Sequence, residues 1–270
     1  MTTDYALGHG EIELKRLETQ AGLIDPITLR FFRDAGLVEG MRVMDIGSGV
    51  GDVALLAARM VGARGEVVGT DRENAALDVA RSRAAALGFG NVVFQSGDPS
   101  DMRFDRPFDA VIGRYVLQFV PNASLFLRKL SAHIRPGGIV AFHELDWKGA
   151  RSAPSVSSYD QCCRWCAETI RKLGAETSMG AMLHQTFIAA GLRPPTMRLE
   201  STVAAGKESD EVVHLVTDLV QSLAPEMERL GVADHRTLGL DGLFERVSQD
   251  VRNAAATVIG RAEVAAWTNV

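Results

Sequence analysis

The sequence has few cysteines, no long uncharged apolar run and no concentration of positive charge. Its cysteines are Cys162, Cys163 and Cys166, and an odd number in one cluster argues against a disulfide framework. A zinc site would need a fourth ligand, so no metal is expected. No run approaches the roughly 20 apolar residues of a membrane span. The start of the chain lacks the pattern of a secretory signal, which predicts a cytoplasmic protein.

The charge pattern is mixed along the whole chain. The formal net charge is −5, and acidic residues are interspersed among the arginines. Proteins that bind nucleic acid usually carry a basic patch or stripe, so neither DNA nor RNA is expected as a partner. With 270 residues, 46% of them hydrophobic, the chain can form one large domain with a sizeable core.

The cysteine cluster fits a helix better than a reactive centre. Tyr159, Cys163, Cys166, Ile170 and Leu173 follow helical spacing. Cysteine is among the residues most often buried, so we expect thiols packed on one face of a helix. Metal or redox chemistry is the alternative, and the missing fourth ligand makes it the weaker one.

Between residues 41 and 147 short apolar runs alternate with helical patterns. This rhythm predicts right-handed βαβ units and a parallel sheet covered by helices on both faces. The expected strands are 42–46, 66–70, 92–95, 108–113 and 139–142, and the expected helices are 52–61, 74–87 and 123–133.

The two ends of the chain follow other patterns. Residues 11–40 are expected to be helical, with Asp25 and Pro26 starting a helix and Gly36 ending it. Residues 148–158 are expected to form a loop. The remaining expected elements are helices at 156–173, 179–190, 209–230 and 241–259, the last including Val258 in its apolar stripe, and strands at 197–204 and 264–267.

A glycine-rich turn joins the first strand of this region to the first helix. The turn reads Asp45-Ile46-Gly47-Ser48-Gly49-Val50-Gly51-Asp52. Glycines at such a turn let a ligand approach the backbone closely. The dinucleotide fingerprint requires glycine where Asp52 stands. An aspartate there would repel a pyrophosphate and suit a cationic amino group or sulfonium, and Asp45 adds a second acid.

This turn resembles the first motif of class I S-adenosylmethionine (SAM)-dependent methyltransferases, roughly acid-x-G-x-G-x-G. Further segments resemble that family in the same order, over residues 40–145. They are Val67–Arg72, Gly97–Pro99, Phe108–Arg114 and His133–Gly138. Several motifs in register are far more specific than one glycine motif.

The resemblance implies a Rossmann-like fold: a seven-stranded, mostly parallel sheet with helices on both faces and helical lid insertions. We expect residues 1–40 to form a helical cap and 41–147 the SAM-binding core. Residues 148–270 would supply the lid insertions and the last strands of the same domain.

The resemblance also implies SAM as cofactor and S-adenosylhomocysteine as its product. Asp71 would bind the ribose hydroxyls and Asp98 the adenine amino group. Read alone, Asp71 would equally cap a helix and Asp98 would form a turn. The full set of expected cofactor-binding residues is Asp45, Gly47, Ser48, Gly49, Asp71, Arg72, Gly97, Asp98, Pro99, Gly113 and Arg114.

Candidate catalytic residues follow the fourth and fifth strands. Glu144 is the first candidate for orienting or deprotonating the acceptor, His143 is the second, and Gln118 is a candidate for orienting it. The alternatives are a packed His143 and a Glu144 that caps backbone groups. Arg114 is equally suited to pairing with one of the acids. Carboxylates near strand ends hold magnesium in some catechol methyltransferases, but adjacent residues rarely point at one ion.

Three aromatic residues are candidates for the acceptor pocket, namely Tyr5, Trp147 and Tyr159. Tyr5 lies near the N-terminus, where fraying is the alternative. Trp147 and Tyr159 follow the fifth strand, and core or dimer contacts are their alternatives. The apolar helices at 209–259 are compatible with a homodimer.

The expected function is transfer of a methyl group from SAM to a small organic acceptor at an O, N or C atom. The resemblance is to methyltransferases of ubiquinone and menaquinone biosynthesis and of natural-product pathways. One alternative is a SAM-binding protein without methyl transfer, such as a catalyst of a pericyclic rearrangement. Another is an NAD-dependent oxidoreductase, which Asp52 disfavours.

Overall fold

The structure, a computed structural model, describes the backbone of residues 11–270 and the side chains from residue 22 onward. The chain divides into two compact units. Unit 1 contains the described residues up to Ile24 together with 145–178 and 200–263, and unit 2 contains residues 25–144, 179–199 and 264–270.

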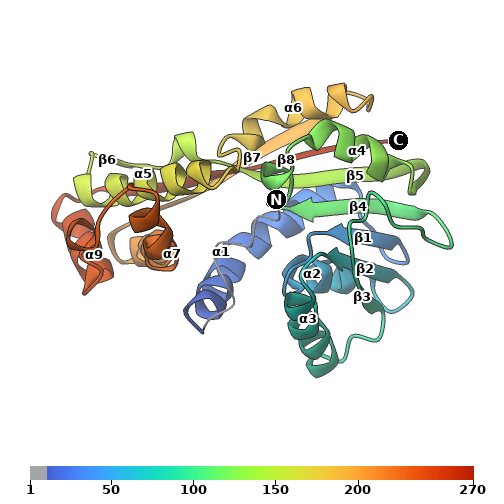
Figure 1. The fold of residues 1–270 in the computed structure, drawn as a ribbon, viewed down its shortest axis with the longest axis horizontal. Helices are drawn as coiled ribbons and strands as arrows, with labels where there is room; N and C mark the ends of the chain where they lie inside the picture. Colours follow the sequence, from blue (N-terminus) through green and yellow to red (C-terminus); the bar gives the residue numbers. More distant parts are fainter. Residues whose placement is uncertain (1–10) are drawn as a thin grey trace. The chain divides into compact units, whose positions relative to one another are not determined.

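Unit 2 contains the parallel strands. Figure 1 shows β5, β4, β1, β2 and β3 stacked in this order, with α2 and α3 beside β1 to β3. The elements of this unit are β1 (Arg42–Ile46), α2 (Asp52–Val61), β2 (Glu66–Asp71), α3 (Asn74–Ala86), β3 (Val92–Ser96), β4 (Phe108–Arg114), the 3-10 turn η1 (Leu117–Phe119), α4 (Ala123–Ser131), most of β5 (Ile134–Asp146) and α6 (Met179–Ala189).

The register of these strands brings their carboxyl ends to one edge of the sheet. Ile46 at the end of β1 pairs with Thr70 of β2 and with Gly113 of β4. Arg114 at the end of β4 pairs with His143 of β5. In an open α/β sheet ligands bind at this edge. The residues that follow each strand are therefore placed where a site is expected.

Burial explains why these strands are almost continuously apolar. All five residues of β1 are buried, as are six of the seven residues of β4. A parallel sheet covered on both faces leaves no solvent-facing side, so apolar residues do not need to alternate with polar ones. Within this core a Cβ atom on Gly113 would lie 2.7 Å from Cε1 of Phe142. Gly113 is therefore required by strand packing.

The N-terminal helix α1 (Glu11–Ala35) corrects one prediction. Asp25 and Pro26 do not start a helix, because α1 continues through Pro26. The Asp25 carboxylate accepts a hydrogen bond from Arg114 at 2.7 Å instead of capping backbone groups. Gly36 ends the helix as predicted, with a φ of 96° and its N–H bonded to the carbonyl of Arg33.

Unit 1 is built on three helices that pack against one another, α5 (Ser157–Lys172), α7 (Ser209–Arg229) and α9 (Leu243–Asn253). The predicted helices at 156–173 and 209–230 are confirmed. Cys162, Cys163 and Cys166 are buried on α5, as predicted. The short helix α8 (His235–Leu238) follows α7 and was not predicted.

Two predictions in unit 1 are wrong for the same reason. The expected loop at 148–158 contains the 3-10 turn η2 (Trp147–Gly149) and a short strand, β6 (Arg151–Ala153). The expected helix at 241–259 ends at Asn253, and Val258 belongs to β8 (Thr257–Asn269), where it pairs with Ser152. Each segment takes its conformation from its strand partner.

The sheet has eight strands, one more than predicted, because β6 extends it. The strand order is β3-β2-β1-β4-β5-β8-β6, and β7 (Thr196–Ala205) pairs with β8. The mostly parallel, Rossmann-like α/β fold predicted from the sequence is confirmed. A search of the described helices finds none long and apolar enough to cross a membrane.

Candidate functional site

The glycine loop between β1 and α2 lies at the carboxyl edge of the sheet. Gly47 and Gly49 have φ angles of 62° and 51°, a region that side chains other than glycine rarely adopt. A Cβ atom on Gly47 would lie 2.8 Å from Cγ2 of Val116. A Cβ atom on Gly49 would meet no atom of the described residues within 4 Å. The loop thus packs on the residues after β4 at one glycine and offers open space at the other.

Asp45, in β1 just before this loop, is a fully buried acid. Its relative exposure is 0%, and neither carboxylate oxygen has a partner among the described residues. Burial raises the pKa of Asp45 well above its ordinary value; Arg114 and the nearby backbone amide of Ala54 oppose this, and Asp71 and Asp52 add to it. A buried carboxylate of this kind attracts a cation strongly.

The next residue with an unsatisfied group is Ser48. Its N–H donates to the carbonyl of Thr70 at 2.9 Å, but its buried hydroxyl oxygen has no partner among the described residues. Asp45 and Ser48 therefore present unsatisfied polar atoms on both sides of Gly47 in the sequence.

Asp71, at the end of β2, holds the loop in place. Its carboxylate accepts hydrogen bonds from the N–H of Gly49 at 2.8 Å and from that of Glu73 at 3.0 Å. The Asp71 carbonyl accepts from the N–H of Gly97 at 2.9 Å, which joins the ends of β2 and β3. Asp71 and Gly97 are thus brought together with the glycine loop.

Asp98 follows β3 and pairs with Arg72 at 2.5 Å. Partial burial opposes its ionisation, but hydrogen bonds from Arg72 and Ser100 outweigh this and hold the pKa of Asp98 below its ordinary value. The neighbouring Pro99 places its carbonyl oxygen 3.0 Å from Nε2 of His133. The structure therefore keeps an ionised acid at the end of β3.

Asp52 does not act as the sequence suggested. Its carboxylate lies 2.7 Å from a guanidinium nitrogen of Arg83 on α3. A second nitrogen of Arg83 donates to the carbonyl of Val50. This ion pair offsets the negative charge of Asp52, whereas Asp45 has no such ion pair among the described residues.

Glu144, at the end of β5, is engaged with backbone amides. Its Oε1 accepts from the N–H of Val116 at 2.9 Å and from that of Leu117 at 2.7 Å, and its Oε2 accepts from that of Gln118 at 3.4 Å. These bonds occupy both carboxylate oxygens. Glu144 is therefore placed as a residue that shapes the turn after β4, as its capping alternative predicted.

His143 and Arg114 belong to a buried network with α1. Nδ1 of His143 lies 3.2 Å from Oγ1 of Thr28, and Arg114 donates to the same oxygen at 3.0 Å and to Asp25 at 2.7 Å. The ring of His143 packs edge-on against Phe31. These contacts match the alternatives of a packed histidine and an arginine paired with an acid.

Gln118 lies in η1 and is buried, with a relative exposure of 6%. Its Nε2 donates to the carbonyl of Tyr115 at 3.3 Å. Its Oε1 is buried and has no partner among the described residues. Tyr115 has a φ of 59°, which is uncommon for a bulky residue and typical of strained functional turns.

The predicted acceptor-pocket residues lie in different surroundings. Trp147 lines a small pocket within unit 1, beside apolar residues of α1 and α7 and a buried Arg261–Glu263 ion pair. Its Nε1 has no hydrogen-bond partner among the described residues. Tyr159 is fully buried, and its hydroxyl donates to the carbonyl of Ile259 at 3.3 Å. Tyr5 lies outside the described residues.

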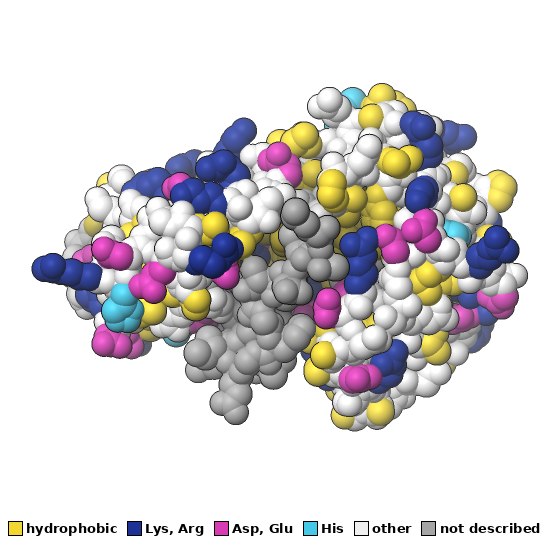
Figure 2. Space-filling view, in the orientation of Figure 1, with side chains coloured by type: hydrophobic (Ala, Val, Ile, Leu, Met, Phe, Trp, Pro, Cys, Tyr) yellow, Lys and Arg dark blue, Asp and Glu magenta, His cyan; other side chains and the backbone are white. Residues whose placement is uncertain are grey.

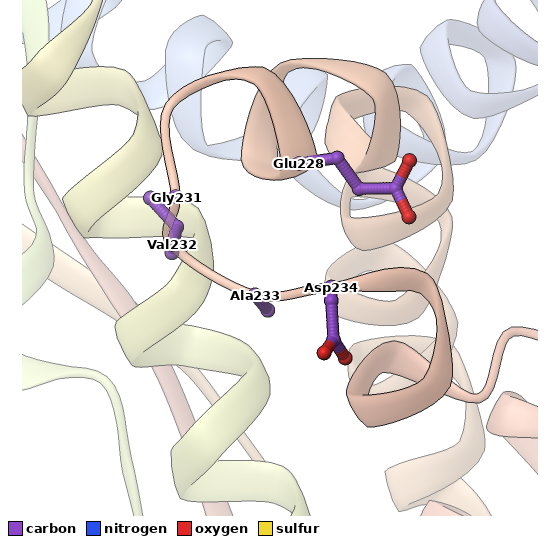
Figure 3. A pocket seen from close by; sticks show the side chains of 5 residues that line it. All are labelled: Glu228, Gly231, Val232, Ala233 and Asp234. Carbon is purple, nitrogen blue, oxygen red and sulfur yellow. The ribbon is translucent and has the colours of Figure 1, made fainter.

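Figure 3 shows another pocket of unit 1, at the turn between α7 and α8. Its lining consists of Glu228, Gly231, Val232, Ala233 and Asp234. The Asp234 side chain caps α8 by accepting from the N–H of Thr237 at 2.7 Å. This hollow contains none of the predicted site residues.

The surface carries mixed charge, and potential metal ligands are dispersed among the described residues. Figure 2 shows side chains of both charges on the visible face. Among the described residues no group of three or more His, Cys, Asp or Glu side chains is arranged to hold a metal ion.

The residues at the glycine loop fit the cofactor that the resemblance implies. SAM has a cationic amino group and a sulfonium, and Asp45 is a buried acid whose carboxylate oxygens have no hydrogen-bond partner in the described part of the chain. The open face of Gly49 leaves room beside the backbone. Asp71 and Asp98 lie at the next two strand ends, where the family binds the ribose and the adenine.

Sequence reasoning missed Thr28, Val116 and Tyr115. No local pattern marks Thr28, which meets Arg114 and His143 only after α1 folds onto the strand ends. Val116 and Tyr115 directly follow the predicted fourth strand. Their position at a strand end was the available signal, since ligands bind there.

Comparison with known protein families gives a direct match. The model of a family described as a methyltransferase domain matches residues 37–191, more than half of the chain.

Curated relatives match a shorter segment. The 2-phytyl-1,4-naphtoquinone methyltransferase of Synechococcus elongatus is 41% identical over 108 residues, which are 39% of this chain and 46% of that protein. The arsenite methyltransferase of Aquipseudomonas alcaligenes is 32% identical over 117 residues, 40% of this chain and 34% of that protein. The chain thus spans less than half the length of these relatives.

Solved structures share the fold over most of the chain. A protein from Bacillus halodurans C-125 superposes with a TM-score of 0.58 at 16% identity, covering 89% of this chain and 96% of that one. The phosphoethanolamine N-methyltransferase 2 of Haemonchus contortus, solved with S-adenosylhomocysteine, gives 0.53 at 18% identity, covering 88% and 51%. The [4+2]-cyclase SpnF gives 0.53 at 17%, covering 90% and 80%. These likenesses show the fold alone.

Proposed function

The chain belongs to the class I SAM-dependent methyltransferase family, and from this premise we propose that it transfers a methyl group from SAM to a small organic molecule. The observation that carries the proposal is Asp45, a fully buried acid beside an open glycine loop, with no partner for either oxygen among the described residues. Leaving a buried charged group unpaired is costly, and a bound cation relieves that cost.

We propose that different residues of unit 2 bind different parts of the cofactor. We assign Asp45 to the cationic amino group of the cofactor, Asp71 to its ribose hydroxyls and Asp98 to its adenine amino group. Gly47, Ser48, Gly49, Arg72, Gly97 and Pro99 complete the proposed binding surface. Gly113 and Arg114 contribute indirectly, because Gly113 packs on Phe142 and Arg114 is held by Asp25.

When bound, SAM supplies an activated electrophilic methyl group. The protein then needs to hold the acceptor in line with that group and to exclude water. Alignment of this kind is worth about 7–11 kcal/mol in favourable cases. The turn after β4, fixed by Glu144, presents Gln118 for this orienting role. We therefore propose that methyl transfer proceeds without Glu144 acting as a base.

The relatives do not identify the acceptor. A naphthoquinone enzyme and an arsenite enzyme match similar shares of this chain, although their named acceptors differ completely. The matched segment therefore carries the common methyl-donor chemistry. Transfer to an O, N or C atom stays open, and Trp147 stays a proposed acceptor contact. A cytoplasmic location, a homodimer and the absence of nucleic-acid partners are also proposals.

Isothermal titration of the purified protein with SAM, S-adenosylhomocysteine and NAD tests the proposal. We expect micromolar binding of SAM and S-adenosylhomocysteine and no binding of NAD. Incubation with SAM and candidate acceptors should then form S-adenosylhomocysteine. Binding of NAD alone would contradict the proposal, whereas tight SAM binding with no turnover on any acceptor would favour a rearrangement or a binding role.

Asp71→Ala should weaken SAM binding about 10-fold to 100-fold. The substitution removes an acceptor for the ribose hydroxyls, and hydrogen bonds to a charged group are worth about 1.5–3 kcal/mol. It also removes the acceptor of the Gly49 amide in the loop. Titration calorimetry measures the change. Asp78→Ala is the matched control, since Asp78 is exposed on α3 and pairs with Arg81. Unchanged affinity in Asp71→Ala would remove Asp71 from the site.

A further inference from the structure

Gln118 is held in one orientation by the turn that contains it. The backbone amides of Val116, Leu117 and Gln118 itself are bound to the Glu144 carboxylate. The side-chain Nε2 donates to the carbonyl of Tyr115 at 3.3 Å. This bond decides which end of the amide is nitrogen, because a carbonyl oxygen accepts hydrogen bonds and cannot donate them.

The oxygen at the other end of this amide has no hydrogen-bond donor among the described residues. Oε1 of Gln118 is buried and has no hydrogen-bond partner among the described residues. Buried polar side-chain atoms usually have a partner, and one without a partner destabilises the ligand-free protein. Because the Nε2 bond and the Glu144 contacts fix the amide, rotation of the side chain would break an existing bond. A donor from a ligand would satisfy Oε1 without that loss.

The position of Gln118 connects this oxygen with the methyl-donor site. Val116, two residues earlier, packs on Gly47 of the glycine loop, where an added Cβ would lie 2.8 Å from it. The turn after β4 and the glycine loop are therefore in direct contact within unit 2. The turn that carries Gln118 therefore packs on the loop proposed to bind the methyl donor.

We propose that Oε1 of Gln118 accepts a hydrogen bond from an O–H or N–H group of the acceptor, so that this enzyme methylates neutral protic molecules. The inference rests on the proposed function and adds the class of its substrate. An uncharged amide oxygen suits a neutral donor, whereas an ammonium group would favour a free carboxylate, and that of Glu144 is bound to amides. In the reaction a lone pair of the acceptor's oxygen or nitrogen forms the bond to the methyl carbon. The carbon–sulfur bond breaks with its electrons going to sulfur, and the proton of the acceptor leaves to solvent.

A binding experiment on the full chain tests this proposal without turnover. The protein is first titrated with S-adenosylhomocysteine and then kept saturated with it. Saturation-transfer NMR compares 1-naphthol with 1-methoxynaphthalene, and N-methylaniline with N,N-dimethylaniline. Each pair differs in one donor proton replaced by a methyl group. Three proteins are compared: the wild type, Gln118→Met, and Gln185→Met, the matched control at an exposed position of α6.

In the wild type we expect the protic member of a pair to bind about 10-fold more tightly, as one additional hydrogen bond allows. Gln118→Met should equalise the two members and leave S-adenosylhomocysteine binding unchanged, and Gln185→Met should behave as the wild type. A wild type without a protic preference, or a preference that survives in Gln118→Met, would overturn the role of Gln118. Failure to bind S-adenosylhomocysteine at all would instead overturn the proposed function.

Discussion

Replacement of Glu144 by alanine is expected to lower the free energy of unfolding by about 3 kcal/mol. The Glu144 side chain is fully buried and accepts hydrogen bonds from the amides of Val116, Leu117 and Gln118. Alanine would leave these donors without their acceptor, and an unsatisfied buried donor costs about 1–3 kcal/mol. Thermal and urea unfolding measure the loss. Glu176→Ala is the control, because Glu176 is an exposed acid that accepts a single backbone amide, that of Ser178.

The catalytic activity of Glu144→Ala should fall by more than its loss of stability explains. With its turn released, Gln118 would no longer be held beside the glycine loop, and misplacement by about 1 Å can reduce a rate about 100-fold. Under conditions where the variant stays folded, kcat should fall while SAM affinity changes little. Glu144→Gln keeps one acceptor oxygen and should show a smaller loss of the same kind. A Glu144→Ala protein with wild-type stability and turnover would show that the amide contacts contribute to neither property.

Glu144 also shows which features of a site residue can be predicted from the sequence. Its place at the end of a strand was predictable from the alternation of strands and helices, and so was its nearness to the site. Its partners were not, because the amides of Val116 and Leu117 lie 28 and 27 residues away in the sequence. Local rules describe neighbours along the chain, whereas a carboxylate's role depends on which groups reach it in space.

The same distinction explains which helices and strands could be predicted from the sequence and which could not. The core strands of unit 2 were predicted because their apolar runs and glycine turns are local signals. The short strand β6 was taken for a loop because its conformation depends on pairing with β8, about 100 residues later. Asp25 and Pro26 carry a local signal for a helix start, but α1 continues through them and Asp25 pairs with Arg114. Tertiary contacts override local preference at such positions.

The two acids that flank the glycine loop differ in whether the fold supplies a partner for them. Asp52 stands where a dinucleotide site needs glycine, and it was expected to attract a cation. Arg83, on the following helix, pairs with it at 2.7 Å. Asp45 is the acid that the fold leaves without a partner among the described residues. A sequence shows the number of charges near a site, and only the fold shows which are already paired.

Asp45→Asn should weaken SAM binding by about 100-fold, because it removes the buried negative charge assigned to the cofactor's amino group. The same change should make the ligand-free protein more stable at neutral pH. Burial raises the pKa of Asp45 well above its ordinary value, and Asp71 and Asp52 add to the effect against the opposing Arg114. Asparagine has a similar shape and no charge to bury. Calorimetric titration and thermal unfolding measure the two effects.

The direction of the pH dependence follows from the same shift. Between the unfolded pKa of Asp45 and its higher folded pKa, the folded protein binds more protons than the unfolded chain. The contribution of Asp45 to stability is therefore largest at low pH and decreases as pH rises through the folded pKa. Asp45→Asn should remove this decrease, so its stabilising effect should grow with pH.

The affinity for the cofactor should depend on pH in the opposite direction to the stability. A cation beside Asp45 favours the ionised carboxylate, so SAM should bind more tightly as pH rises through the ligand-free pKa, with release of a proton. Titrations in buffers of different ionisation enthalpy count that proton. Asp45→Asn should release none from this position. If the variant binds SAM as the wild type does and releases the same number of protons, the amino group of the cofactor is held elsewhere. A fall in ligand-free stability alongside weaker binding would instead mean that Asp45 supports the loop.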